Sequence, residues 1–246
     1  MAKLETVFGL HAVQALLKSA PQRVNEVLVL QGRHDQRLQK VLAAAASADI
    51  KVRQASRKEL DKLVDGNHQG VVAMSFPGEL HDEKFLYQML ESLKQDPFLL
   101  VLDGVTDPHN LGACLRTAEA AGVHAVIAPK DNSASLTPTA RKVSCGAAEV
   151  LPYIPVTNLA RCLRKLQELG VWLIGTAGEA PQSVYQQDFK GPMALVMGAE
   201  GPGMRRLTRE CCDGLVNIPM AGEVSSLNVS VATGVCLFEA VRQRNA

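Results

Sequence analysis

The stretch that decides the fold is FLLVLDGVTDPHNLGACLRTAEAAG, residues 98–122. It opens with five consecutive apolar residues (98–102), which predict a strand buried on both faces, as in a parallel sheet. A polar turn follows, and then a helix predicted over 111–121 that Gly122 closes. A buried strand that passes through a polar turn into a helix is typical of a βαβ unit, so we expect an α/β fold.

The same alternation continues to the C-terminus. Strands are predicted over 124–128, 153–156, 171–176, 194–197 and 215–218, and helices over 137–147, 159–169 and 226–242. This repetition predicts a mostly parallel sheet with helices on both faces. Ligands of such sheets bind beyond the carboxyl ends of the strands, so the polar turns at these ends are the candidate site.

The residues before this sheet form a second α/β pattern. It has predicted helices over 9–19, 35–48 and 57–64, and predicted strands over 24–30, 50–54 and 71–76. An acidic stretch over 76–96, part of which can form a helix, is interpreted as a linker. The predicted organisation is therefore a small N-terminal domain (1–75), the linker, and a larger domain (97–246).

Charge is unevenly distributed along the 246 residues. The whole chain carries a net +1, but residues 1–75 carry +4 and residues 76–96 carry −3. A basic N-terminal part is compatible with a polyanionic partner such as a nucleic acid. The apolar runs are too short to span a membrane, and the N-terminus lacks the pattern of a signal peptide, so we expect a cytoplasmic protein.

Six cysteines raise the possibility of disulfides or a metal site. They show no C-x-x-C spacing and no histidine at ligand spacing. The pattern favours reduced thiols, and we predict no structural metal.

The first polar turn runs from Asp103 to Arg116. Asn110 stands where an N-cap is expected, which would be a purely structural role. Arg116 is the lone basic residue of a small, apolar helix. Such an arginine is either solvated at the surface or, this close to the carboxyl end of a strand, part of a site.

Two further segments are rich in small and polar residues. LVMGAEGPGMRRL (195–207) is either a tight turn or an anion-binding loop, although it matches neither glycine-rich nucleotide fingerprint. In IPMAGEVSSLNVSVATGVCLFEA (218–240), Ser225 or Ser226 is expected to cap a helix whose first turn holds Asn228 and Ser230. These polar groups serve either as caps or as the lip of a cofactor pocket.

Together, in this order and spacing, the segments 103–122, 195–207 and 218–240 resemble the three signature motifs of the SpoU/TrmH branch of the SPOUT methyltransferases. The N-terminal part, with HAVQALL (11–17) and His68-Gln69-Gly70, resembles the RNA-substrate-binding domain of many members. The resemblance implies S-adenosylmethionine-dependent 2′-O-methylation of a guanosine ribose in 23S rRNA, in the peptidyl-transferase loop region. It also implies a C-terminal trefoil knot and a homodimer, without metal or membrane.

The resemblance further implies roles for individual residues. The catalytic set is Arg116, Asn110, Glu200, Ser226 and Asn228; the cofactor would be held by Thr176, Gly178, Gly198, Ile218, Met220 and Leu227; Arg205, Arg206 and Arg209 would contact RNA phosphates. The small residues 232–234 would allow close approach of helices between subunits.

Arg116 is open to two interpretations. The family's arginine is often described as the base that removes the 2′-hydroxyl proton. Because a guanidinium has a pKa above about 12, we favour stabilisation of developing alkoxide charge instead.

Three other functions stay open. A tRNA ribose methylase would carry the same motifs, and an RNA-binding module that has lost catalysis would keep the fold. A dinucleotide-binding enzyme is disfavoured, because no glycine-rich fingerprint follows Leu102.

Overall fold

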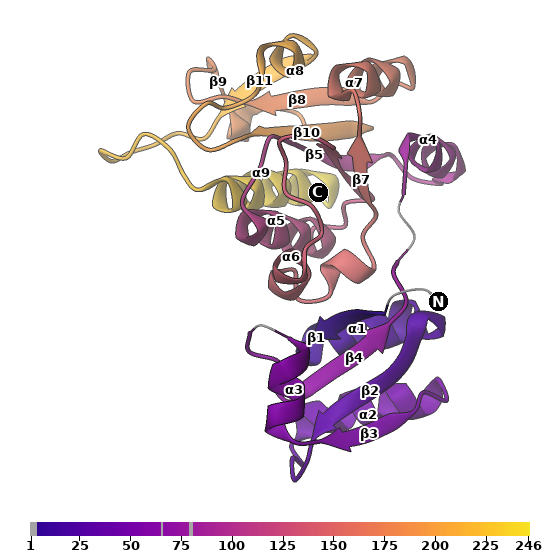
Figure 1. Cartoon of the computed structure of the whole chain (residues 1–246). Helices are drawn as coiled ribbons and strands as arrows, with labels where there is room; N and C mark the ends of the chain where they lie inside the picture. The colour runs from indigo at the N-terminus through magenta and orange to yellow at the C-terminus, as the bar shows by residue number, and fades with distance from the viewer. Residues whose placement is uncertain (1–3, 65, 79–80) are drawn as a thin grey trace. The chain divides into compact units, whose positions relative to one another are not determined.

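The computed structural model describes residues 4–64, 66–78 and 81–246, and these residues form two compact units (Figure 1). One unit contains the described residues up to Gly78 together with Leu136–Val150. The other contains the described residues from His81 to Ser135 and Leu151–Ala246. The segment 136–150 thus packs with the N-terminal unit, although the sequence pattern placed it within the 97–246 domain.

The first unit is a four-stranded sheet covered by helices on both faces. The strand order is β1 (Glu5–Phe8), β4 (Val71–Ser75), β2 (Val24–Leu30), β3 (Val52–Ala55), and only the β2–β3 pairing is parallel. Leu16 of α1 (Leu10–Ser19) and Val41 of α2 (Gln36–Ser47) are buried in one cluster, and Leu60 of α3 (Arg57–Leu63) lies in a second. Strand β1 was not predicted, because four residues are too few to establish a period.

The segment 136–150 is held in this unit by a buried acid. It forms α6 (Pro138–Val143) and a short 3₁₀ helix (Ala147–Glu149). The side chain of Glu149 is only 1% exposed and pairs with Arg23 at 3.1 Å and Arg141 at 2.7 Å. The single helix predicted over 137–147 is wrong, because Cys145 and Gly146 adopt φ values of 52° and 100° that end it.

The second unit is a seven-stranded sheet in which every pairing is parallel, so the predicted α/β fold with a mostly parallel sheet is confirmed. The order is β7 (Tyr153–Val156), β6 (Ala125–Pro129), β5 (Phe98–Asp103), β10 (Met193–Gly198), β8 (Trp172–Thr176), β11 (Gly214–Asn217), β9 (Gln182–Ser183). The two-residue β9 was not predicted.

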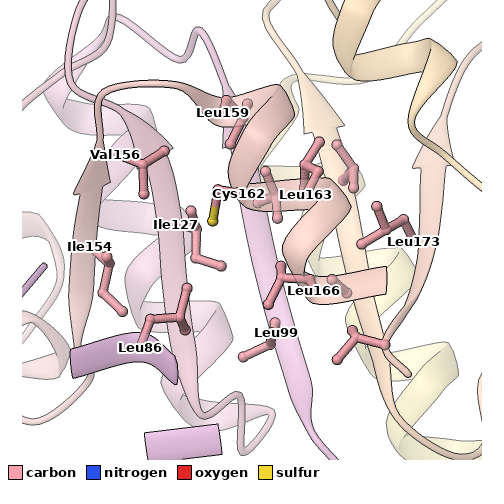
Figure 2. Close-up of a cluster of buried hydrophobic side chains, with 14 of the residues drawn as sticks. Leu86, Leu99, Ile127, Ile154, Val156, Leu159, Cys162, Leu163, Leu166 and Leu173 are labelled. Atoms are coloured by element: carbon pink, nitrogen blue, oxygen red, sulfur yellow. The ribbon is translucent and has the colours of Figure 1, made fainter. Parts of the chain in front are cut away.

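Helices cover both faces of this sheet. On one face, α4 (Glu83–Ser92) and α7 (Leu159–Glu168) pack with the end of α8 (Arg206–Glu210), and Figure 2 shows leucines of α4 and α7 against the strands. On the other, α5 (Pro108–Ala120) and α9 (Val229–Arg244) lie side by side (Figure 1). Leu86 of α4 is fully buried, so the stretch interpreted as a linker contributes a helix to the core.

Two helix starts differ from the prediction, and both bear on the site. Helix α5 begins at Pro108 because Asp107, not Asn110, is its N-cap and accepts from the amide of His109 at 2.9 Å. Helix α9 begins at Val229 rather than near Ser226, and Asn228 is its cap. The amide side chain of Asn110 is therefore not needed as a cap.

Candidate active site

The candidate site lies where the strand order of the second unit reverses. Strand β10 is inserted between β5 and β8, while the chain continues from β5 to β6 on the opposite side. Crevices at such a switch point are the usual ligand sites of parallel sheets. The carboxyl ends of β5, β10 and β8 bring Asp103, Gly198 and Thr176, respectively, to one edge of the sheet.

Three predicted site residues, one from each motif, meet at this edge. The amide nitrogen of Asn228 donates to the side-chain oxygen of Asn110 at 3.0 Å and also to Glu200. Asn110 in turn donates to Oε1 of Glu200 at 3.4 Å. These residues are far apart in sequence, so their contact is a property of the fold.

The carboxylate of Glu200 ties the start of α9 to α5. The same Oε1 atom also accepts the backbone amide of Val229 at 3.2 Å, in the first turn of α9. A carboxylate is favourable there because helix N-termini carry partial positive charge. Glu200 is thus placed to hold Asn228 in position.

The glycines of the second motif serve the turn itself. The amide of Ala199 donates to the carbonyl of Gly203 at 3.1 Å, and Gly203 donates back at 3.0 Å. A Cβ at Gly198 would collide with the backbone of Gly203 and Met204. Close approach of the chain to itself therefore explains Gly198 without an anion.

A cavity of about 820 Å³ lies beside this turn. Its lining includes all six residues predicted to hold the cofactor, namely Thr176, Gly178, Gly198, Ile218, Met220 and Leu227, and also Glu200, Ser226 and Asn228. Glu179, Met197 and Asn217 line it too, although none of them was among the predicted site residues; Met197 lies in the second motif, whereas Glu179 and Asn217 lie outside all three. Its wall combines apolar side chains such as Ile218 and Leu227 with polar ones such as Asn217 and Asn228, which suits a nucleoside-sized ligand with both kinds of surface.

The three arginines predicted to contact phosphates all have acidic neighbours. Arg205 donates through its backbone amide (2.8 Å) and its Nε (2.6 Å) to Asp103, whose side chain is fully buried. Arg206 pairs with Glu210 at 2.5 Å, and Arg209 pairs with Glu179. Exposed ion pairs of the latter kind exchange partners at little cost, whereas Arg205 is needed by a buried charge.

Arg116 is not brought into this cluster. It lies on α5, its side chain is exposed, and it does not line the cavity. Among the residues that the structure describes, no carboxylate forms an ion pair with it. A single chain therefore places Glu200, Ser226 and Asn228 in the lining of the cavity, with Asn110 bonded to Glu200 and Asn228, and it leaves Arg116 outside.

The interface of α5 and α9 contains small buried residues. Thr233 is fully buried and lies 3.6 Å from the sulfur of Cys114. Of the small residues 232–234, Thr233 therefore packs inside its own chain. Burial raises the pKa of Cys114 to about 11, so its thiol is protonated at neutral pH.

All six cysteines are free thiols. Within the described part of the chain, no three His, Cys, Asp or Glu side chains are grouped as metal ligands. No helix among the described residues is long and apolar enough to cross a membrane.

Two family models match the chain. The model described as the SpoU rRNA Methylase family covers residues 97–238, and that described as RNA 2'-O ribose methyltransferase substrate binding covers residues 6–80. The 23S rRNA (guanosine-2'-O-)-methyltransferase RlmB of Pseudomonas putida is 62% identical over 244 residues, 99% of this chain and 98% of the relative. The RlmB of Escherichia coli K12 is 61% identical over 242 residues, 98% of this chain and 99% of the relative.

Solved structures share the fold. An RNA 2'-O ribose methyltransferase aligns with a TM-score of 0.82 at 26% identity, covering 100% of this chain and 90% of that one. The SpoU methyltransferase AviRb from Streptomyces viridochromogenes, solved in complex with AdoMet, aligns with a TM-score of 0.80 at 24% identity, covering 98% and 90%.

Proposed function

Because the chain belongs to the SpoU rRNA methylase family, we propose that it transfers a methyl group from S-adenosylmethionine to the ribose 2′-hydroxyl of a guanosine in 23S rRNA. The observation that carries the proposal is the meeting of Asn110, Glu200 and Asn228 beside the cavity. We further propose that the target guanosine lies in the peptidyl-transferase loop region and that the protein acts in the cytoplasm. The trefoil knot also belongs to the proposal, supported by the insertion of β10 between β5 and β8 and by the return of α9 onto β10 and α5.

The cavity suits S-adenosylmethionine, which supplies an electrophilic methyl group when bound. Its volume of about 820 Å³ lies in the range of small-molecule sites. The apolar side chains of Met197, Ile218 and Leu227 would face the adenine. At Gly178 an added Cβ would meet nothing within 4 Å, so this backbone is open to the ligand.

The protein's task is to align a poorly acidic hydroxyl with the methyl donor. Such alignment lowers barriers by up to about 7–11 kcal/mol in favourable systems. Asn110 would orient the ribose or Arg116, and Glu200 would keep Asn228 in position. Arg116 would stabilise the charge that develops on the ribose oxygen.

A homodimer is part of the proposal. Val231 and Phe238 lie two helical turns apart on α9 and are 52% and 49% exposed, so one apolar face is uncovered. Arg116 lies outside the cavity of its own chain, and a second copy would complete the site with it. We predict that Phe238→Glu converts dimer to monomer in sedimentation velocity, whereas the exposed Leu169→Glu does not. A wild-type monomer at micromolar concentration would contradict the prediction.

Mapping of ribose methylation tests the function. We expect rRNA from a strain without this protein to lack one methylated guanosine in 23S rRNA, and the purified protein to restore it. The purified protein is also assayed on tRNA in parallel with 23S rRNA. A tRNA methylase would modify the tRNA instead. Calorimetry that finds binding of NAD but not of S-adenosylmethionine would overturn the proposal.

A further inference from the structure

The last residue of α9 is fastened to backbone from two other segments. The guanidinium of Arg244 donates to the carbonyls of Phe189 (3.2 Å), Gly191 (2.6 Å) and Asp96 (3.0 Å). It also lies over the ring of Phe98, 4.9 Å from the centroid. A planar group with five fixed donors can satisfy several carbonyls at once, which a lysine cannot.

Gln243 strengthens the same attachment. Its side-chain oxygen accepts from the amide of Phe189 at 2.9 Å, and its nitrogen donates to the carbonyl of Gln187 at 2.9 Å. We call Gln243 and Arg244, with the backbone that they bind, the C-terminal clamp.

The clamp joins the starts of the strands that lead to the site. Phe98 is the first residue of β5, Asp96 lies two residues before that strand, and Gly191 lies two residues before β10. The two strands pair in parallel from Phe98↔Met193 to Asp103↔Gly198, so both run from the clamp to the site edge. One guanidinium thus joins the ends of β5, β10 and α9 that lie farthest from the site, and these are the three elements that lead to the three motifs.

Helix α9 and strand β10 are consequently joined at both ends. At the site, Glu200, just after β10, binds Asn228 and the amide of Val229. At the far end, the clamp holds α9 to the residues that precede β10. A helix fixed at both ends cannot slide along its strand.

We propose that Arg244 and Gln243 are positioning residues for methyl transfer: they set the register of α9 along β10 and thereby keep Asn228 in contact with Asn110 and Glu200. The inference rests on the proposed function of this site. Because α9 is about 24 Å long, the two residues act from the opposite end of the helix.

Arg244→Ala is the first test, and Arg242→Ala is its matched control. Arg242 lies on the same turn, but its side chain is 66% exposed and pairs with Glu239 of its own helix. We expect kcat on a 23S rRNA fragment, at saturating S-adenosylmethionine, to fall about tenfold for Arg244→Ala and less than twofold for Arg242→Ala. The kcat values of Arg244→Lys and Gln243→Ala should lie between those of Arg244→Ala and Arg242→Ala. These two variants replace Arg244→Ala in the test if that variant does not fold. Full activity in folded Arg244→Ala would overturn the proposal.

A double-mutant cycle with Asn228→Ala separates positioning from general stabilisation. Residues this far apart normally act independently, so their effects on rate multiply. If the clamp acts through Asn228, Arg244→Ala will have less than a twofold effect in the Asn228→Ala background. Multiplicative effects would overturn the proposal. Absence of methylation by the wild-type protein would instead overturn the proposed function. The same double-mutant cycle would then be measured with the Kd for S-adenosylmethionine in place of kcat.

Discussion

Glu200 is the residue on which the polar cluster depends, because a single carboxylate oxygen accepts from Asn110, Asn228 and the amide of Val229. None of these donors is on the loop that carries Glu200. One side chain therefore fixes the geometry between three separate parts of the chain.

Replacement of Glu200 by glutamine tests this arrangement. The amide oxygen can still accept, but the charge is lost, and a carboxylate at a helix N-terminus contributes about 0.3–1 kcal/mol. We expect the free energy of unfolding to fall by about that amount and kcat by about tenfold, with a larger loss for Glu200→Ala. The exposed Glu210→Gln in the neighbouring helix is the control for stability. An unchanged kcat in Glu200→Gln would show that the carboxylate charge is not required.

The pH dependence of activity in variants of Arg116 distinguishes two mechanisms. Loss of a group that stabilises transition-state charge costs about 10²–10³ in kcat, which we expect for Arg116→Ala. Arg116→Lys should keep a part of the activity, with a pH–rate profile parallel to that of the wild type. Full activity with a shifted basic limb would instead favour a general-base role.

The positions of site residues were predictable only where the sequence also predicted the course of the backbone. The sequence predicted the cavity lining at Thr176, Gly198 and Leu227 through the resemblance to the family. The expectation that Asn110 caps the helix was wrong, because Asp107 caps it three residues earlier and Pro108 occupies its first position. The sequence also could not show that Arg205 is committed to buried Asp103.

At the scale of elements, the strands of the parallel sheet were the most predictable part. A strand buried on both faces is an unbroken apolar run, and FLLVL forms the first five residues of β5. Short elements such as β1 and β9 lack such a signal. The burial of α4 was missed because the whole stretch 76–96, with its net charge of −3, was interpreted as a linker, although Leu86 is buried in the core.

The start of β5 supplies a pH-dependent element. The backbone amide of Phe98 donates to Nδ1 of His124 at 2.9 Å, which requires the neutral ring. Burial lowers the pKa of His124, and the nearby charge of Arg244 lowers it further. In the unfolded chain a histidine has a pKa of about 6.5. The unfolded state therefore binds more protons below that pH, and the free energy of unfolding falls as the pH is lowered through this range.

Urea unfolding between pH 5 and 7 measures this effect. We expect His124→Gln to show a weaker loss of stability with falling pH than the wild type. His34→Gln, at an exposed position in the first unit, should follow the wild type. An equal slope for His124→Gln and wild type would rule out His124 as the source.

At the scale of the whole molecule, we expect the first unit to recognise RNA and the second to carry the chemistry. All residues around the cavity lie in the second unit, while the excess positive charge lies in the first 75 residues. Arg37 and Lys40 are exposed on one face of α2, and binding of RNA phosphates by such residues releases counterions. Affinity for rRNA should therefore depend on salt through the first unit, and affinity for the cofactor should not.

The double variant Arg37→Glu/Lys40→Glu tests this division. We expect the Kd for a 23S rRNA fragment to rise at low salt, and the slope of log K against log salt to become shallower by about 1 per lost phosphate contact. The Kd for S-adenosylmethionine should stay the same, because the cavity lies in the other unit. A matched pair in the second unit, Arg164→Glu/Lys190→Glu, controls for the change in net charge. If both pairs change the salt slope equally, RNA responds to the total charge of the protein rather than to its N-terminal unit.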